Sequence, residues 1–583
     1  MKEILSGNEA VARGAFEGGL HFACAYPGTP STEILENIAK YREIHSHWSV
    51  NEKTALETAL GASFGGMRSL VAMKHVGLNV AADPFFSAGY IGATGGFVII
   101  TADDPGMHSS QNEQDNRNYA RAAKIPMLEP SDSQEAKDFT KIALTMSEEF
   151  DTPVLLRLTT RISHSKSIVE LADREIVEVK GYEKNVKKNL VMPAHARLLH
   201  KKVEERLLKL KELSNDFKYN FIEYKDKKVG VITSGISYQY VKEALPSASV
   251  LKISLTWPLP NRLIKEFADN VENLYVVEEN DPFIETEVKA MGIRITGKDI
   301  IPIVGELNQR IVKESFKEVE KYSLKETAEK SPARPPALCP GCPHTAVFHA
   351  INKLKLIATG DIGCYTLGAL PPLNAMDTCV DMGASITNAL GLEYALRGKD
   401  KRKIVAVIGD STFYHSGITG LIDLVYNKGT STVIILDNSI TAMTGHQENP
   451  GTGKNLMGEN APKFNLENLV KGLGIDDVYT VDAYDLEAVT NLIKRETERE
   501  KPSVIIARRP CILLPEMKKK VFDKYEIIEE KCTGCQLCVK LGCPAISFDK
   551  EKKKARINSS LCVGCSLCFQ VCKVGAIKKV QGE

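Results

Sequence analysis

Eight cysteines near the C-terminal end constrain the fold of that region more than any other feature of the 583-residue chain. They lie in two runs, CTGCQLCVKLGCPA and CVGCSLCFQVCKVGA, with repeated two-residue gaps. Such gaps let three thiolates converge on one face of an iron-sulfur cubane, and these clusters use soft thiolate ligands. The spacing predicts two [4Fe-4S] clusters with the ligands Cys532, Cys535, Cys538, Cys543, Cys562, Cys565, Cys568 and Cys572.

The two runs resemble those of the two-cluster bacterial ferredoxins, in which the fourth cysteine of each run ligates the other cluster. Zinc is a weaker alternative, because four-thiolate zinc uses pairs of CxxC and not two triplets. Disulfides are weaker still, since we see neither an apolar signal segment at Met1 nor a run of about 18 apolar residues. Four residues separate Cys538 from Cys543 where three are usual, so we expect an altered loop there.

Composition narrows the function classes for the rest of the chain. A formal charge of +1 argues against a nucleic-acid partner, and the absence of a long apolar run argues against a membrane span. Fourteen cysteines without an export signal favour a reducing cytoplasm. The lysine runs 518–520 and 552–554 are typical of solvated faces, or they attract an acidic electron carrier.

The order of apolar runs predicts several α/β domains. Residues 21–26, 69–73, 97–101 and 153–158 are short apolar runs typical of buried parallel strands, and they place a doubly wound α/β domain at 1–183. Residues 184–225 predict a helical linker, and 226–315 a smaller α/β domain without a phosphate-binding glycine loop. A polar, proline-bearing linker at 316–337 leads to another doubly wound domain at 338–515 and a ferredoxin domain (α+β) at 520–583.

Polar residues follow two predicted strands in the 338–515 domain. Strand IVAVI leads to Gly409, Asp410 and Ser411, and strand TVIIL leads to Asp437 and Asn438. In an open parallel sheet, ligands gather beyond the carboxyl ends of the strands. A carboxylate and an amide oxygen there suit Mg²⁺, which completes its shell with water and phosphate oxygens, and Gly409 allows close backbone approach to the phosphates.

This segment resembles the thiamine diphosphate motif, which begins GDG and ends NN. Ser411 replaces the second glycine of GDG, and Asp437 replaces the first asparagine of NN. The resemblance implies that Asp410, Asn438 and the backbone carbonyl of Ile440 hold the metal. An ordinary turn pair between strands and helices remains the alternative.

Thiamine chemistry also needs a carboxylic acid beside the aminopyrimidine, typically a buried glutamate with a raised pKa on a separate domain. In WSVNEKTALETALG, Glu52 begins a helix of small residues directly after an apolar stretch. Such a glutamate often only complements the helix dipole. The thiamine resemblance favours Glu52 as the catalytic acid.

Several further segments are similar to the thiamine-dependent 2-oxoacid:ferredoxin oxidoreductases, in particular to large subunits of the indolepyruvate type. They are YPGTPSTE at 26–33, MKHVGLN at 73–79, DDPGMHSSQNEQDNR at 103–117, LCPGCPH at 338–344 and GDIGCYTLGALPPL at 360–373. The resemblance covers essentially the whole chain. It implies that the 1–183 domain binds the pyrimidine, that the 338–515 domain binds the diphosphate, and that 226–315 is similar to a transketolase C-terminal domain. It nominates Thr29 and Arg117 for the substrate carboxylate and His344 for the cofactor.

The resemblance also implies an activity. An arylpyruvate would lose carbon dioxide, the clusters would take two electrons for ferredoxin, and coenzyme A would accept the acyl group to give an aryl-acetyl-CoA. A small subunit would complete a hetero-oligomer such as α2β2. Alternatives are the same chemistry on another 2-oxoacid, a nonredox thiamine-dependent decarboxylase, and a noncatalytic electron-transfer subunit.

Six cysteines lie outside the ferredoxin runs. Cys339, Cys342, Cys364 and Cys511 resemble the ligands of a third [4Fe-4S] cluster that related enzymes place beside thiamine. Core or helix-end cysteines are the alternative. We assign Cys24 and Cys379 to packing.

Overall fold

The computed structural model describes residues 1–316, 335–396, 402–520 and 522–580. It divides into two compact units, Met1–Thr327 and Ala328–Glu583. Most of the predicted 316–337 linker lies outside the described residues, so each unit is described by itself.

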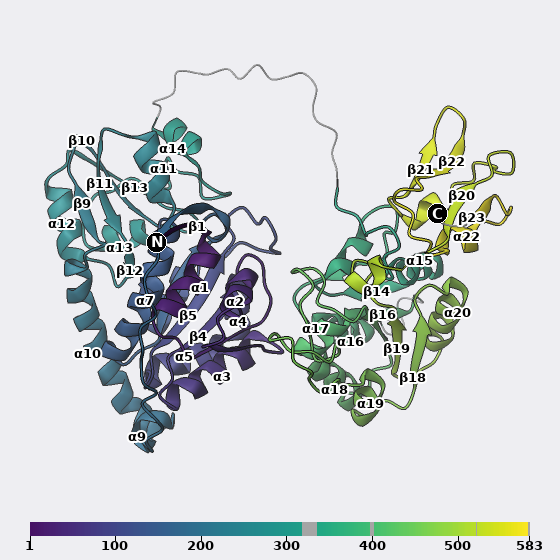
Figure 1. Cartoon of the computed structure of the whole chain (residues 1–583), viewed down its shortest axis with the longest axis horizontal. Coiled ribbons are helices and arrows are strands. Elements are labelled where there is room, and N and C mark those ends of the chain that lie inside the picture. The colour runs from purple at the N-terminus through teal and green to yellow at the C-terminus, as the bar shows by residue number, and fades with distance from the viewer. Residues whose placement is uncertain (317–334, 397–401, 521, 581–583) are drawn as a thin grey trace. The chain divides into compact units, whose positions relative to one another are not determined.

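The N-terminal domain contains a seven-stranded sheet in the order β12-β6-β7-β5-β4-β2-β3, in which only β12 is antiparallel (Figure 1). The four predicted apolar runs form β2 (Phe22–Ala25), β4 (Ser69–Lys74), β5 (Phe97–Asp103) and β7 (Val154–Thr159). Every residue of these strands is buried, as a sheet with both faces covered requires. The doubly wound prediction is therefore confirmed for this region.

The other elements of this domain connect or flank the sheet. They are β1 (Lys2–Ser6), α1 (Gly7–Glu17), α2 (Thr32–Ile38), β3 (His45–Trp48), α3 (Glu52–Phe64), α4 (His75–Val80), α5 (Ala82–Ile91), α6 (Arg117–Ala123), β6 (Met127–Leu128), α7 (Ser133–Phe150), α8 (Thr160–His164) and β8 (Lys166–Glu170).

The predicted helical linker contains α9 (Val186–Asn189) and the long helix α10 (Pro193–Asp216), but it also ends in a strand. Strand β9 (Phe221–Glu223) pairs antiparallel with β11 (Ala248–Ile253), so the middle sheet begins before the predicted boundary at residue 226. Its order is β13-β10-β11-β9, with β10 (Asp226–Ser234) and β13 (Asn273–Val277). Strand β12 (Leu255–Trp257) leaves this domain and joins the N-terminal sheet beside β6.

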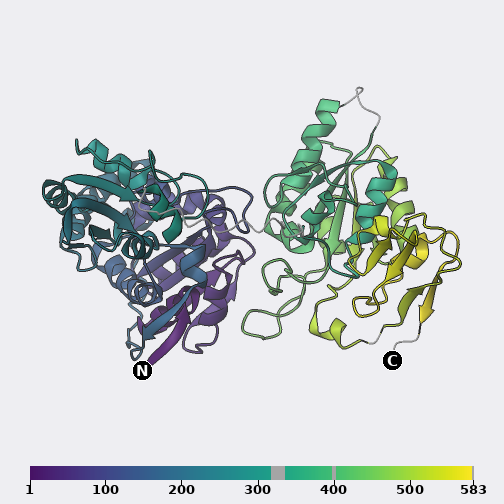
Figure 2. The same cartoon turned by 90° about the horizontal axis from the view of Figure 1, so that it is seen from above.

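Four helices complete the middle domain, which stands beside the N-terminal domain in both views (Figure 1 and Figure 2). They are α11 (Ser237–Ala244), α12 (Asn261–Asp269), α13 (Phe283–Ala290) and α14 (Gln309–Ser315). Because β12 crosses between the two sheets, the two domains form one unit.

A buried ion-pair network connects these two domains. The Arg117 side chain is 1% exposed, and its Nη1 donates to Glu278 Oε2 at 2.6 Å and its Nη2 to Asp115 Oδ2 at 2.5 Å. Glu278 directly follows β13 of the middle domain. Arg157 on β7 pairs with Asp103 at 2.7 Å in the same network. The Arg117 guanidinium thus holds two domains together, and its contact with the substrate carboxylate stays a prediction.

In the second unit, the diphosphate domain contains an all-parallel sheet in the order β15-β14-β16-β17-β19-β18. The predicted strands IVAVI and TVIIL are the neighbours β16 (Ile404–Gly409) and β17 (Thr432–Asp437). The remaining strands are β14 (Ile357–Gly360), β15 (Thr378–Cys379), β18 (Val478–Asp482) and β19 (Ser503–Arg508).

Helical segments cover this sheet. They are α15 (Thr345–Leu354), η1 (Cys364–Ala369), α16 (Ala384–Leu396), α17 (Asp410–Thr412), η2 (Phe413–Gly417), α18 (Ile418–Tyr426), α19 (Leu466–Gly472), α20 (Leu486–Thr497) and α21 (Pro515–Lys518). The segments α17, η2 and α18 follow one another without a break, and together they form the helical connection between β16 and β17.

The ferredoxin domain, yellow in Figure 1 and Figure 2, packs against the diphosphate domain. Two antiparallel strand pairs form it, β20 (Lys524–Ile527) with β23 (Ile577–Val580) and β21 (Ile546–Asp549) with β22 (Lys554–Ile557). Two short helices, η3 (Val539–Leu541) and α22 (Leu567–Val571), complete it. The predicted α+β class of this domain is confirmed.

Within the described ranges, no helix combines the length and the apolar composition that a membrane crossing requires.

The ion-pair network predicts a strong effect of removing one charge. Replacing Arg117→Met leaves the Asp115 and Glu278 carboxylates buried without their partner, which typically costs about 3–5 kcal/mol of unfolding free energy. We expect a loss of this size for the transition of the N-terminal unit in urea, followed by circular dichroism.

Arg121→Met is the matched control. Both arginines lie over the Phe283 ring, at 5.1 Å for Arg117 and 5.3 Å for Arg121, but the ion pair of Arg121 with Glu287 is partly exposed. Its loss should cost no more than about 1 kcal/mol. An Arg117→Met protein of normal stability would contradict the structural role given to this arginine.

Candidate active site and iron-sulfur centres

The structure brings Asp410 and Asn438 to the same edge of the diphosphate-domain sheet. Gly409, the last residue of β16, is paired with Leu436 of β17, so the residues after both strands emerge side by side. Asp410 is 3% exposed and Asn438 is 7% exposed. The Asn438 amide oxygen accepts a hydrogen bond from the Ile440 N–H at 3.3 Å, which brings the third predicted metal-binding residue into the same turn.

Electrostatics at this edge favour a cation. Burial, reinforced by the nearby Asp437 carboxylate, raises the pKa of Asp410 to about 8. The Asn449 amide lies 3.4 Å from Asp410 Oδ2 and offers a neutral donor only. A carboxylate oxygen, an amide oxygen and a backbone carbonyl are hard ligands of the kind that Mg²⁺ takes. The donor set therefore fits a magnesium ion with diphosphate.

Asp437, the departure from the thiamine motif, has a partner of its own. Its Oδ2 accepts from Arg508 Nε at 2.6 Å, and the two residues face each other across β17 and β19. The same guanidinium donates to both oxygens of Glu467. An aspartate at this position is therefore explained by the arginine on the next strand.

Tyr365 occupies the space beside Gly409. A Cβ added to Gly409 would lie 2.6 Å from Tyr365 Cε1, so only glycine fits under this ring. His344 packs edge-on against the same ring with centroids 5.9 Å apart, and burial lowers the pKa of His344 to about 4. The imidazole is therefore neutral. Ser411, the other departure from the motif, accepts a hydrogen bond from Thr441 Oγ1 at 2.8 Å.

Glu52 begins α3 at the carboxyl edge of the N-terminal sheet and is 5% exposed. Asn51 caps the helix by accepting from the Thr54 N–H at 2.9 Å. The Glu52 side chain packs on Gly77 of α4, where an added Cβ would lie 2.7 Å from Glu52 Oε1. Thr29, after β2, is partly buried at the same edge. The similar segments 26–33 and 73–79 thus meet at this edge, where Gly28 lies against Lys74, and the second of them carries the Gly77 surface under Glu52.

The eight ferredoxin cysteines form two groups. Beyond the effect of burial, Cys532, Cys535 and Cys572 raise the pKa of the Cys538 thiol. In the other group, burial and then Cys543 and Cys562 raise the pKa of the Cys565 thiol. Burial and then Cys565, Cys562 and Cys543 raise the pKa of the Cys568 thiol, with a smaller contribution from Cys538 of the first group. The fourth cysteine of each run therefore lies with the first three of the other, the crossed arrangement of two-cluster ferredoxins.

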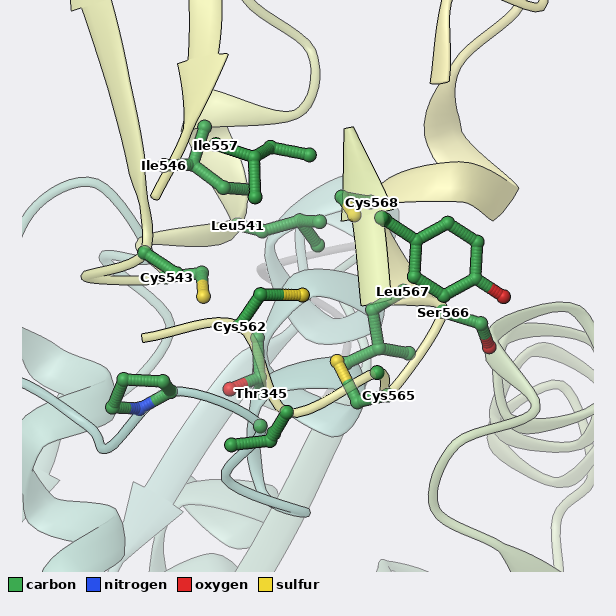
Figure 3. Close-up of a pocket in the computed structure, with 16 residues that line it drawn as sticks. Thr345, Leu541, Cys543, Ile546, Ile557, Cys562, Cys565, Ser566, Leu567 and Cys568 are labelled. Carbon is green, nitrogen blue, oxygen red and sulfur yellow. The ribbon is translucent and has the colours of Figure 1, made fainter. Parts of the chain in front are cut away.

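Figure 3 shows the sulfurs of Cys543, Cys562, Cys565 and Cys568 facing the same space. Apolar side chains line it, among them Leu541, Ile546, Ile557 and Leu567. An apolar shell of this kind excludes water from a cluster. No three His, Cys, Asp or Glu side chains of the described residues converge on a single-ion site.

The extra residue before Cys543 is absorbed by a tight turn. Residues Val539–Leu541 form the short helix η3, and Gly542 ends it with a φ of +68°, donating to the Val539 carbonyl at 3.0 Å. Leu541 turns into the domain core and is 1% exposed. The altered loop expected from the sequence therefore still delivers Cys543 to its group.

The four cysteines nominated for a third cluster lie together. Burial, and then the neighbouring Cys339, Cys364 and Cys511, raise the pKa of the Cys342 thiol. Cys364 is likewise affected by burial, which with Cys511 and Cys339 raises its pKa to about 11. Cys24 instead donates to the Ala55 carbonyl in the N-terminal core, and Cys379 is exposed.

Gly341 joins this third group to the ferredoxin domain. It lies between Cys339 and Cys342, and its backbone lowers the pKa of the Cys543 thiol, which burial raises. A Cβ added to Gly341 would lie 2.1 Å from Val563 Cγ2. The Tyr484 hydroxyl donates to the Gly341 carbonyl and fixes this contact.

Sequence reasoning missed several of these residues for a common reason. Tyr365 and Gly77 lie inside similar segments, but nothing in the sequence shows what their neighbours are. Arg508 carries no motif signal, because its partner Asp437 is brought to it only by strand pairing.

Comparisons with known proteins agree with this arrangement. The family "Pyruvate flavodoxin/ferredoxin oxidoreductase, thiamine diP-bdg" matches residues 13–220, "Thiamine pyrophosphate enzyme, C-terminal TPP binding domain" matches 361–507, and "4Fe-4S dicluster domain" matches 524–573. The fold and site thus define a thiamine-diphosphate-dependent oxidoreductase that carries its own iron-sulfur domain.

Similar proteins narrow the class further. The indolepyruvate oxidoreductase subunit IorA of Pyrococcus horikoshii is 43% identical over 100% of this chain and 98% of its own length. That of Thermococcus kodakarensis is 44% identical over 100% and 97%. The chain belongs to the family of the indolepyruvate oxidoreductase subunit IorA. A solved 2-oxoglutarate:ferredoxin oxidoreductase from Magnetococcus marinus covers 54% of this chain and 65% of its own, with 19% identity and a TM-score of 0.46.

These findings confirm the predicted fold class of two thiamine-binding α/β regions with a dicluster domain. They also confirm the predicted family, the enzyme class, and thiamine and iron-sulfur cofactors.

The contact between Gly77 and Glu52 generates a prediction. In Gly77→Ala the new methyl group displaces the Glu52 side chain, and a misplacement of about 1 Å can cost about a hundredfold in turnover. We expect a fall of that order in 2-oxoacid-dependent viologen reduction.

Gly61→Ala is the control, because it lies on α3 itself and no atom lies within 4 Å of its added Cβ. It should keep full activity and gain about 0.5–1 kcal/mol in stability. Equal activities of the two variants would show that the Glu52 position does not matter.

Proposed function

We propose that this chain is the catalytic subunit of an enzyme that oxidatively decarboxylates arylpyruvates, indolepyruvate among them, to aryl-acetyl-CoA and reduces ferredoxin. One observation carries the proposal: a buried oxygen-ligand site at two parallel strand ends shares a compact unit with the two crossed cysteine groups. The full-length similarity to proteins named indolepyruvate oxidoreductase supports the substrate class.

In this proposal Asp410, Asn438 and the Ile440 carbonyl hold Mg²⁺, which binds the diphosphate. Bound thiamine supplies the nucleophilic carbon and takes up the electron pair that the departing carbon dioxide leaves. Gly409, Ser411 and His344 line the cofactor side of the site. The raised pKa of Asp410 supports this arrangement, because a divalent cation offsets the cost of burying its charge.

Glu52 is the group that exchanges a proton with the aminopyrimidine ring nitrogen. Its burial at 5% exposure supports this role, because a water-excluded carboxyl group keeps its proton transfer directed at one partner. The Gly77 surface holds the side chain in one position. Thr29 at the same edge contacts the substrate.

The cysteines form the electron outlet. We infer three [4Fe-4S] clusters, one on Cys339, Cys342, Cys364 and Cys511 and two in the ferredoxin domain. Each accepts one electron at a time when present. The contact of Gly341 with Cys543 and Val563 supports an exit through the Cys543 group first.

The same proposal includes partners that complete the enzyme. A small subunit joins this chain in a hetero-oligomer such as α2β2, coenzyme A accepts the acyl group, and an acidic ferredoxin takes the electrons. Exposed Lys550, Lys552 and Lys553 beside the Cys532 loop support an acidic carrier, since a Cβ on Gly534 would meet the Lys553 carbonyl at 2.3 Å. The fourteen cysteines, all outside disulfides, favour the cytoplasm.

An anaerobic panel of 2-oxoacids tests the function. We would measure methyl viologen reduction with and without coenzyme A and the small subunit, using indolepyruvate, phenylpyruvate, pyruvate and 2-oxoglutarate. We expect coenzyme A-dependent reduction that is fastest with the arylpyruvates. Aldehyde release without viologen reduction would instead identify a nonredox decarboxylase, and preference for pyruvate would change the substrate.

The Glu52→Gln variant belongs in the same panel. It keeps the size and burial of the side chain but removes the exchangeable carboxyl proton, so turnover should disappear while iron content stays normal. Glu57→Gln, on the exposed side of α3, is the control. Near-normal turnover in Glu52→Gln would remove Glu52 from its role.

Iron analysis tests the third cluster. Four irons per cubane predict about twelve per reconstituted chain, and about eight in the double variant Cys339→Ser/Cys342→Ser. Cys379→Ser should keep the wild-type content, since this cysteine is outside the group. About eight irons in the wild type would contradict a third cluster.

A further inference from the structure

Lys74 is a buried lysine at the carboxyl edge of the N-terminal sheet. It ends β4 and directly precedes α4, and β4 lies between β2 and β5 in the sheet. The loops that follow those two strands therefore flank it. One carries Thr29 and the other carries Ser109.

Its ammonium group lacks the counter-ion that the other buried lysines have. Among the described residues, three lysines are buried: Lys137 pairs with Glu17 at 3.2 Å, Lys252 pairs with Glu135, and Lys74 forms no ion pair with a carboxylate. Its Nζ donates to the Ser109 carbonyl at 2.6 Å. A neutral carbonyl only partly repays the cost of burying a positive charge.

The Asp104 carboxylate, which opposes the burial effect on Lys74, is occupied by other donors. Asp104 accepts from the Ser109 N–H at 2.8 Å, from Ser110 Oγ at 2.6 Å and from Thr160 Oγ1 at 2.6 Å. These bonds hold the loop after β5 in place. Asp104 affects Lys74 only through space.

Lys74 adjoins both residues given roles at this edge. A Cβ on Gly28, the neighbour of Thr29, would lie 3.1 Å from Lys74 Cβ, and Ser109 Oγ is 3.4 Å from the Thr29 carbonyl. Three residues after Lys74, Gly77 supports Glu52. One short segment thus contacts the substrate loop and the catalytic acid.

We propose that Lys74 binds the carboxylate of the 2-oxoacid substrate, the role that sequence reasoning gave to Arg117. The inference rests on the proposed function, since it takes a 2-oxoacid as the ligand. A compact ammonium group suits a carboxylate that must leave as carbon dioxide. It attracts the anion as a point charge and does not hold it in the fixed bidentate geometry of an arginine guanidinium. Lys74 then contacts the reacting part of the substrate.

The ionisation of Lys74 gives the inference a pH signature. Burial lowers the pKa of Lys74 to about 8, and Asp104 opposes this shift. His75, the next residue, has a pKa that burial lowers, and Glu52 packs on Gly77 of the same segment. The free enzyme therefore holds a charged ammonium below pH 8 and loses it above. We expect kcat/KM for indolepyruvate to be level below about pH 8 and to fall above it.

Steady-state kinetics of the holoenzyme with its small subunit test Lys74→Met. Loss of a charge-assisted hydrogen bond predicts a KM for indolepyruvate about 10- to 100-fold higher, with a much smaller change in kcat. Lys74→Arg should recover part of the affinity. In Lys74→Met the fall in kcat/KM above pH 8 should disappear. An unchanged KM, or a wild-type profile that stays level to pH 9.5, would overturn the assignment.

A binding measurement separates this inference from the proposed function. We would compare inhibition constants, or equilibrium binding, for indole-3-propionate and its uncharged amide. The wild type should prefer the acid about 10-fold or more, and Lys74→Met should bind the two alike. If the enzyme oxidises no 2-oxoacid but still binds the acid more tightly than the amide, the proposed function is wrong and the anion site stands. If the enzyme oxidises 2-oxoacids but binds the acid and the amide alike, the function stands and the assignment of Lys74 is wrong. Lys53→Met, an exposed lysine on α3, is the control.

Discussion

Parallel pairing of neighbouring strands is the constraint on which both units depend. Parallel strands end at the same edge, so residues far apart in sequence become neighbours there. In the first unit, β2, β4 and β5 bring Thr29, Lys74 and Ser109 together. In the second, β16, β17 and β19 align Asp410, Asp437 and Arg508. A one-residue slip in either sheet would turn these side chains to the other face.

The buried charged residues fall into two kinds, according to the groups that surround each charge. Arg117 and Arg157 are surrounded by carboxylates, and their network fixes the middle domain to the N-terminal sheet. Lys74 has a carbonyl, and Asp410 has an amide and a second carboxylate nearby. The first kind of charge stabilises the fold by itself. Burial of the second kind of charge destabilises the folded chain until a charged ligand binds. Ligand binding then offsets this destabilisation.

Much of this architecture was predictable from the sequence, because apolar strands and cysteine spacing are local signals. The apolar runs predicted the strands β2, β4, β5 and β7, and the cysteine triplets predicted the two crossed groups of the ferredoxin domain. Strand β12 was not predictable, because three residues carry no sign of which sheet they join. The ion pairs of Arg117 were not predictable for a related reason: a basic residue in a similar segment looks the same whether it faces a ligand or a buried glutamate from another domain. Lys74 lay in a recognised segment, but the sequence could not show that it lacks a counter-ion, because its surroundings are formed by three loops that meet only in the folded chain.

The contact at Gly341 has a consequence for electron movement under the three-cluster assignment. Between the cysteine loop of the diphosphate domain and that of the ferredoxin domain, the Gly341 main chain packs against the Val563 side chain, and the Tyr484 hydroxyl donates to the Gly341 carbonyl. No side chain fits at position 341, so the packing of the two domains sets the width of this gap. The rate at which charge crosses it is then a fixed property of domain packing, and it stays the same whichever acid is being consumed.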